Sequence, residues 1–291
     1  MIFPLNFNHE LIKDNKAGAI FRFAMWQLKS RMYRRDLIHS WIDGSKFYVK
    51  NGETGLTQNI YAGLHEFEDM GFLLHCLNDN DEFIDIGANS GSYSILAGAV
   101  CGARVLAIEP VGTTFQRLVN NFTLNGLDKV SKALNVGLGA SSGTLVMTSG
   151  LDTTNQIVLG ETEFATVEVQ VVTLDEVTRD MNPTLIKMDV EGWETEVVRG
   201  GSKTLSNPSL LGIIIELNES GFRYGYRDSE IVSSLKDFGF LPFSYDPRNR
   251  ILKSLEKQNP KGGNTIFVRN QSEVIRRMQI APKRQVLRDW I

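Results

Sequence analysis

The chain has 291 residues, of which 42% are hydrophobic and 22% charged, and its formal net charge is −3. These values are ordinary for a globular protein, either one large domain or a domain with an appendage, and they give no sign of nucleic-acid binding. No apolar run reaches the roughly 18 residues that cross a bilayer. The two cysteines, Cys76 and Cys101, are too few for a disulfide framework and lie in no metal-binding pattern. We therefore expect two buried, reduced thiols in a cytoplasmic protein.

The first predicted element is a basic helix within residues 17–41. Ile20, Ala24, Leu28 and Met32 recur at helical spacing along it. Within residues 1–50, nine Lys or Arg face four acids, an excess of +5. Two interpretations stay open. The helix docks on the main domain with a solvated polar side, as charged helix faces usually do, or it makes a weak peripheral contact with an anionic membrane.

Beyond a second helical pattern at 60–77, extended and helical patterns alternate. Strands are predicted at 82–86, 104–108, 131–138, 184–189, 211–217, 240–245 and 265–268, and helices at 90–99, 114–124, 194–205 and 229–238. Two further β-rich runs, 144–148 and 166–172, suit an inserted hairpin or arm. The alternation predicts an α/β fold with a doubly wound, seven-stranded, mainly parallel, Rossmann-like sheet. Its last two strands have no helix between them and suit an antiparallel pair at one edge.

The most informative run is EFIDIGANSGSYS, residues 82–94. A short apolar strand ends at the carboxylate of Asp85, and Gly87 and Gly91 then frame a tight turn before a helix. Such a unit presents backbone N–H groups to a nucleotide-like ligand. A second acid, Glu109, follows the next strand 22 residues after Gly87 (109 − 87), the distance at which a carboxylate accepts hydrogen bonds from ribose hydroxyls.

A second run places charges in an apolar strand, at Lys187, Asp189 and Glu191. If residues 185–191 are extended, these side chains share one face. Such groups belong near the carboxyl end of a central strand, in the crevice where α/β sheets bind ligands. The alternative is a structural ion pair between Lys187 and one of the acids.

These patterns resemble the class I S-adenosylmethionine-dependent methyltransferases, and within them the FkbM-type enzymes. The match rests on D-x-G-A-N-x-G-x-Y at 85–93, Glu109-Pro110, K-x-D-x-E-G at 187–192 and Glu66-Phe67 upstream. It covers about residues 55–270 and departs at 139–142, where the family often has an acidic or polar residue, so the adenine contact is expected to be mostly backbone. The resemblance implies an N-terminal helical and extended cap (1–60), a methyltransferase domain (61–270) and a C-terminal helical tail (271–291).

The resemblance also implies S-adenosyl-L-methionine as the cofactor. The residues expected to bind it are Glu66, Asp85, Gly87, Ala88, Asn89, Gly91, Tyr93, Glu109, Pro110 and Asp189. Asp85 is placed to bond the methionine ammonium and Glu109 to take the ribose diol. The glycines let the backbone approach the cofactor closely.

Methyl transfer to a hydroxyl requires in-line alignment and a group that takes the proton. Asp189 and Glu191 are the first candidates and Glu216, at the end of the next strand, is the second; Lys187 shifts their pKa values through its charge. No cluster has metal-ligand spacing, so no metal is expected, although Asp189, Glu191 and Glu216 could gather as an oxygen site for a divalent cation. Some aromatic side chains either stack on a sugar ring or simply pack: Tyr61, Trp193, Phe222, Tyr224 and Tyr226.

The predicted function is O-methylation of a sugar, a glycan or a related small hydroxylated acceptor, because residues 41–70 resemble members associated with glycan biosynthesis. No nucleic-acid partner is expected. Two rivals stay open. One is an NAD(P)-dependent oxidoreductase on a Rossmann sheet. Asn89 and Ser92 argue against it, because they occupy positions where the dinucleotide-binding fingerprint has glycines. The other is a non-catalytic scaffold in a glycan-biosynthesis assembly, docked through the basic helix.

Overall fold

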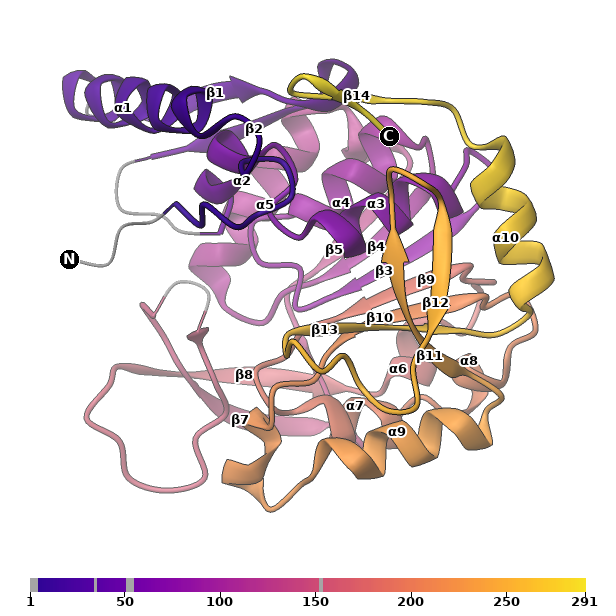
Figure 1. Ribbon diagram of the computed structural model, residues 1–291. Helices are drawn as coiled ribbons and strands as arrows, with labels where there is room; N and C mark the ends of the chain where they lie inside the picture. Colours follow the sequence, from indigo (N-terminus) through magenta and orange to yellow (C-terminus); the bar gives the residue numbers. More distant parts are fainter. Residues whose placement is uncertain (1–4, 34–35, 51–54, 152–153) are drawn as a thin grey trace.

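A computed structural model describes residues 5–33, 36–50, 55–151 and 154–291. Its centre is an eight-stranded sheet with helices on both faces (Figure 1). The strands, from edge to edge, are β12 (Ile251–Ser254), β11 (Leu241–Asp246), β13 (Asn264–Val268), β10 (Gly212–Glu216), β9 (Leu185–Met188), β3 (Glu82–Ile86), β4 (Arg104–Ile108) and β5 (Lys132–Leu134). Strands β10 to β5 run parallel, whereas β13 is antiparallel to both β10 and β11. The doubly wound α/β class and the antiparallel terminal strand are confirmed.

The sheet has one strand more than the seven expected. The additional strand, β12, pairs antiparallel with β11 across the turn at residues 247–250. It lies in the polar stretch between the last two predicted strands. None of its four residues is buried, so no alternation of buried and exposed positions marks it in the sequence.

Each face of the sheet has its own core, because successive strand residues point to opposite sides. Phe83 and Ile84, consecutive in β3, belong to different clusters. The helices packed on the Phe83 side are α3 (Phe67–Cys76), α4 (Ser92–Ile95), α5 (Gly112–Leu124) and α10 (Gln271–Ile280). Those on the Ile84 side are α6 (Leu174–Val177), α7 (Glu194–Arg199), α8 (Ser202–Ser206) and α9 (Asp228–Asp237). Burial on both faces explains the nearly continuous apolar strands.

The strand order reverses between β3 and β9. The chain passes from β3 to β4 and β5 on one side, and later from β9 to β10 on the other. In open α/β sheets, ligands bind outside the carboxyl ends of the strands at such a switch point. Asp85 in β3 and Lys187 in β9 are partners in register there.

The predicted arm is a three-stranded sheet, in the order β6 (Gly137–Leu138), β8 (Thr166–Val172) and β7 (Gly143–Thr148). Figure 1 shows β7 and β8 reaching out beside the main sheet. The single strand expected at 131–138 is therefore divided between two sheets. Asn135 stands at the break, where its Nδ2 donates hydrogen bonds to the carbonyls of Glu109 and Pro110.

The N-terminal part folds as α1 (Lys16–Met32), β1 (Leu37–Ser40), β2 (Lys46–Val49) and α2 (Thr57–Ala62). The first helix is thus shorter than 17–41. The helix expected at 60–77 is two helices, because Gly63 leaves α2 with φ at 80° and α3 starts only at Phe67. The helix expected at 194–205 likewise divides, at Gly200-Gly201.

A short π-helix, Leu96–Val100, follows α4, and a hairpin of β14 (Gln285–Val286) and β15 (Asp289–Trp290) follows α10. Short 3-10 helices lie at Ile42–Gly44, Leu127–Lys129 and Ser220–Tyr224. Cys76 and Cys101 are buried and form no disulfide bond, as expected. Among the described residues, no helix has both the length and the hydropathy needed to cross a membrane.

Replacing Gly87 by alanine tests the turn between β3 and α4. A Cβ at Gly87 would lie 1.8 Å from the Asp189 carbonyl oxygen, and its φ is +73°. We expect Gly87→Ala to lower the free energy of unfolding by about 2–4 kcal/mol in urea titrations. Gly143→Ala is the control, since nothing lies within 4 Å of a Cβ there, and should stay within about 0.5 kcal/mol of wild type. Equal, small effects would contradict this explanation of the turn.

Candidate active site

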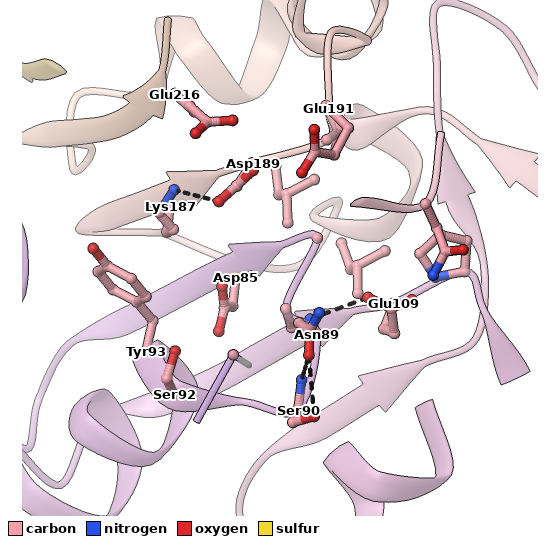
Figure 2. Close-up of a pocket in the computed structure, with 18 of the residues that line it drawn as sticks. Asp85, Asn89, Ser90, Ser92, Tyr93, Glu109, Lys187, Asp189, Glu191 and Glu216 are labelled. Carbon is pink, nitrogen blue, oxygen red and sulfur yellow. Dashed lines mark hydrogen bonds and ion pairs between the residues drawn. The ribbon is translucent and has the colours of Figure 1, made fainter. Parts of the chain in front are cut away.

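A pocket of about 300 Å³ lies at the carboxyl ends of β3, β4, β9 and β10 (Figure 2). It brings together nearly all the predicted site residues: Glu66, Asp85, Gly87, Ala88, Asn89, Tyr93, Glu109, Pro110, Lys187, Asp189, Glu191 and Glu216. Gly91 is the exception and does not line the pocket. Its φ of +91° turns the chain into α4, where a Cβ would meet the Leu118 side chain at 2.7 Å.

Glu109 is held at the end of β4 by the loop that it faces. Its Oε2 accepts a hydrogen bond from the Asn89 N–H at 3.0 Å, and its Oε1 accepts one from the Val111 N–H at 2.9 Å. Burial raises the pKa of this carboxyl to about 7, although the two backbone bonds oppose the rise. Each oxygen keeps acceptor capacity for a ribose hydroxyl.

Residues 136–138, directly before and within β6, form the pocket wall next to Glu109. Val136 and Leu138 supply apolar side chains and Gly137 bare backbone, a surface suited to a flat base. Residues 139–142, where the family resemblance departs, form the turn between β6 and β7 and are not among the lining residues.

Asp85 is the penultimate residue of the central strand β3 and is 2% exposed. Its Oδ2 accepts a hydrogen bond from the Ser94 hydroxyl at 2.6 Å. Burial raises the pKa of the Asp85 carboxyl to about 6, against the opposing effects of Ser94 and Lys187. A cationic group in the pocket would favour the ionised form of Asp85.

Lys187 is a buried cation in the middle of the sheet, 2% exposed. Its Nζ donates to Asn264 Oδ1 at 2.9 Å and to Asp189 Oδ2 at 3.2 Å, and lies 5.4 Å from the centroid of the Tyr93 ring. Burial alone would lower the pKa of Lys187, but Asp189, Glu66, Glu216 and Asp69 together raise it. The lysine therefore stays charged and holds Asp189 in place.

Glu66 joins this network from the other side. Its Oε1 accepts from Asn264 Nδ2 at 2.6 Å and its Oε2 accepts from the Tyr93 hydroxyl at 2.7 Å. Asn264 Nδ2 also donates to Asp69 Oδ2 at 3.2 Å, and burial together with the Glu66 charge raises the pKa of Asp69 to about 7. Asn264 and Asp69 were not singled out from the sequence, since neither belongs to a motif. The only signal was that a buried lysine needs acceptors.

The strand β9 ends at Met188, so the extended path to Glu191 that the sequence suggested is not formed. Glu191 instead has φ at 54°, and a carboxylate oxygen of Asp189, of Glu191 and of Glu216 all lie within 4.8 Å of one another. Burial and the charge of Asp189 raise the pKa of Glu191 to about 7 and that of Glu216 to about 8. Such a group can accept a proton near neutral pH.

The arm and the N-terminal part supply the outer walls. Met147, Asn155 and Ile157 come from the arm, and Leu56, Gln58 and His65 come from the segment around α2. His65, which lies between α2 and α3, thus borders the site, and burial lowers the pKa of its ring.

Among the five aromatic candidates, only Trp193 lines the pocket. Tyr224 packs edge-on against it at 5.1 Å between ring centroids, and the Tyr224 hydroxyl donates to the Ile157 carbonyl at 2.9 Å. Tyr226 packs on the same indole at 6.3 Å. Phe222 is 63% exposed, whereas Tyr61 is buried beneath α1. Trp193 is therefore the aromatic side chain that can meet an acceptor.

The pocket is strongly acidic. Its described lining contains six Asp or Glu side chains and one lysine. Such a site attracts a cation and repels a diphosphate, which disfavours the dinucleotide interpretation.

A sequence model of the methyltransferase FkbM domain matches residues 85–242, more than half of the chain. The chain belongs to the FkbM methyltransferase domain family. The matched range contains the glycine loop, Glu109 and the K-x-D-x-E-G run, whereas Glu66 and Asn264 lie outside it. The resemblance drawn from the motifs is thereby confirmed.

Two curated relatives carry methyltransferase names. Methyltransferase sdnD of Sordaria araneosa is 28% identical, over 44% of this chain and 65% of that protein. Hexuronic acid methyltransferase AglP of Haloferax volcanii is 28% identical, over 50% of this chain and 59% of that protein. The chain spans less than two thirds of the length of either relative. The structure was also compared with precorrin-6y C5,15-methyltransferase of Geobacter metallireducens GS-15. The TM-score is 0.43 and the sequence identity 12%, over 76% of this chain and 93% of that one. This similarity is too slight to bear on function.

The raised carboxyl pKa values predict a pH dependence of stability. Glu216 has a folded pKa of about 8 against 4.5 unfolded, so its contribution is fully present below pH 4.5 and is lost as pH rises through about 8. We expect the free energy of unfolding of the ligand-free chain to fall between about pH 5 and pH 8. Glu216→Gln should flatten this slope in urea titrations, whereas Glu168→Gln, which removes an exposed glutamate of β8, should leave it unchanged. A slope unaffected by Glu216→Gln would contradict the assignment.

Proposed function

We propose that this chain is an S-adenosylmethionine-dependent O-methyltransferase whose acceptor is a hydroxyl of a neutral sugar or of a related small molecule. The observation that carries the proposal is the acidic pocket at the switch point, with Glu109 at the ribose position. S-Adenosylmethionine carries a sulfonium, an ammonium and one carboxylate, so it is a net cation, which six carboxyl groups favour.

When the cofactor is bound, Glu109 would take the two ribose hydroxyls, residues 136–138 would cover the base, and the Asp85 carboxylate would accept a hydrogen bond from the ammonium. The acidic lining supports this placement, because it offers acceptors to both groups. When bound, the cofactor supplies an electrophilic methyl group on a cationic sulfur.

The acceptor side is the cluster of Asp189, Glu191 and Glu216. Asp189, fixed by Lys187, accepts a hydrogen bond from the acceptor hydroxyl and orients it. Glu191, with a pKa of about 7, would take the proton that the acceptor hydroxyl loses when its oxygen receives the methyl group. Glu216 is the second candidate for that proton.

The same charges restrict the acceptor. A uronate would bring a further negative charge against Asp189, Glu191 and Glu216, and Lys187 is already committed to Asp189 and Asn264. A neutral hydroxylated ring avoids this repulsion and can pack against Trp193. The hexuronic acid named for the Haloferax relative is therefore the informative competitor for an acceptor assay.

Methyl transfer tests the proposal directly. S-Adenosylmethionine labelled in its methyl group is incubated with neutral hexosides and matched hexuronosides, and label in the product is counted. We expect transfer to a neutral acceptor, and Glu191→Gln should lower kcat by about 10²–10⁴-fold with little change in the KM for the cofactor. Glu168→Gln serves as the control for loss of one negative charge.

Two results would contradict the proposal. Preference for hexuronosides would overturn the acceptor assignment. Activity that requires added Mg²⁺ and is abolished by EDTA would assign the three carboxylates to a cation instead of a proton.

A further inference from the structure

The outward side of α1 is apolar. The helix docks through Ala19, Trp26 and Ser30, which are buried, and through Arg22, whose guanidinium donates to the Tyr61 carbonyl at 2.9 and 2.7 Å. Its opposite side carries large hydrophobic residues that are exposed: Ile20 (45%), Phe21 (66%), Leu28 (55%) and Met32 (65%). Tyr33, directly after α1, and Ile38 of β1 are exposed as well, so that six of the 17 exposed large hydrophobic side chains among the described residues lie within 20–38.

Of the two interpretations drawn from the sequence, this arrangement contradicts the first, a helix docked with its polar side in solvent, and agrees with the second, contact with an anionic membrane. The apolar residues at helical spacing were expected to dock and the polar side to face solvent. The structure turns Ile20, Leu28 and Met32 outward instead. Figure 1 shows α1 at the periphery of the molecule, at the upper left. Contiguous exposed apolar patches mark interaction surfaces.

The charge of this surface indicates its partner. The sequence of α1 contains Lys16, Arg22, Lys29 and Arg31 and no acid. Residues 1–50 carry +5, so the remaining residues carry −8 (−3 − 5). The exposed stripe therefore lies in the positive part of an otherwise acidic chain. An apolar stripe flanked by basic residues is the pattern of a helix that lies in the plane of a membrane interface.

We propose that α1 and β1 dock this protein on an anionic lipid surface. Phe21, Leu28 and Met32 enter the region between headgroups and acyl chains, and Lys16, Lys29 and Arg31, all exposed, meet the lipid phosphates. A second copy of the chain fits less well, because a two-fold contact between α1 helices would bring the same cations together without an acid on either helix.

The surface is connected to the pocket through α2. The ring of Phe23 in α1 packs edge-on against Tyr61 of α2 at 5.4 Å, and Gln58 of the same helix lines the pocket. A bound membrane would therefore lie one helix away from the site. The inference rests on the surface of α1 and does not depend on the proposed methyl transfer.

Vesicle flotation of the full chain tests the proposal. Vesicles of phosphatidylcholine alone are compared with an equimolar mixture of phosphatidylcholine and phosphatidylglycerol. We expect binding only to the anionic vesicles, with release at an ionic strength of roughly 1 M, where the screening length is about 3 Å. Phe21→Ser combined with Leu28→Ser should weaken partitioning roughly tenfold or more, since both side chains are exposed and contribute through lipid contact.

The matched control is Ile275→Ser combined with Ile280→Ser, which removes two exposed isoleucines from α10 and should leave binding unchanged. Thermal unfolding of both double variants confirms that they fold. Three results would overturn the proposal: no flotation of the wild type with anionic vesicles, equal flotation of the Phe21/Leu28 variant, or equal binding to neutral vesicles. A lipid-free dimer in sedimentation that the same variant dissociates would also overturn it, in favour of a second copy.

Discussion

The site is organised around one buried cation. Lys187 occupies a central strand with 2% of its surface exposed, and its charge requires acceptors that arrive from elsewhere in the chain. Asn264 reaches it from β13, Asp189 from the end of its own strand, and Glu66 through Asn264 from the start of α3. Removing one partner from a buried, paired charge typically costs about 3–5 kcal/mol, so this network constrains the sheet, the antiparallel strand and α3 together.

The network also determines the electrostatics of the pocket. One lysine cannot neutralise six carboxyl groups, and burial raises the pKa values of several of them to between about 6 and 8. A cationic ligand relieves this repulsion, whereas an anionic one increases it. Lys187 holds Asp189 in place, whereas burial raises the pKa of Glu191 to about 7 and that of Glu216 to about 8. One site can thus contain both an orienting carboxylate and a proton acceptor.

The sequence predicts best what is local. The loop at residues 85–93 and Glu109 belong to one strand–turn–helix unit and the strand after it, so their spacing determines their geometry. Lys187 and Asn264, by contrast, are 77 residues apart, and no periodicity connects them. The break at Asn135 and the division of the 60–77 helix at Gly63 depend on single contacts and single φ angles. For α1, helical spacing identifies an apolar stripe but does not say whether it faces the core or solvent.

Calorimetric titration tests whether the pocket binds an adenosyl cofactor through Glu109. S-Adenosylhomocysteine and NADH are each titrated into the wild type, Glu109→Ala and the exposed-charge control Glu168→Ala. We expect micromolar binding of S-adenosylhomocysteine and no binding of NADH. Glu109→Ala should weaken the binding free energy of S-adenosylhomocysteine by about 1.5–3 kcal/mol, and the control should leave it unchanged. Binding of NADH without S-adenosylhomocysteine, or binding that Glu109→Ala does not weaken, would contradict it.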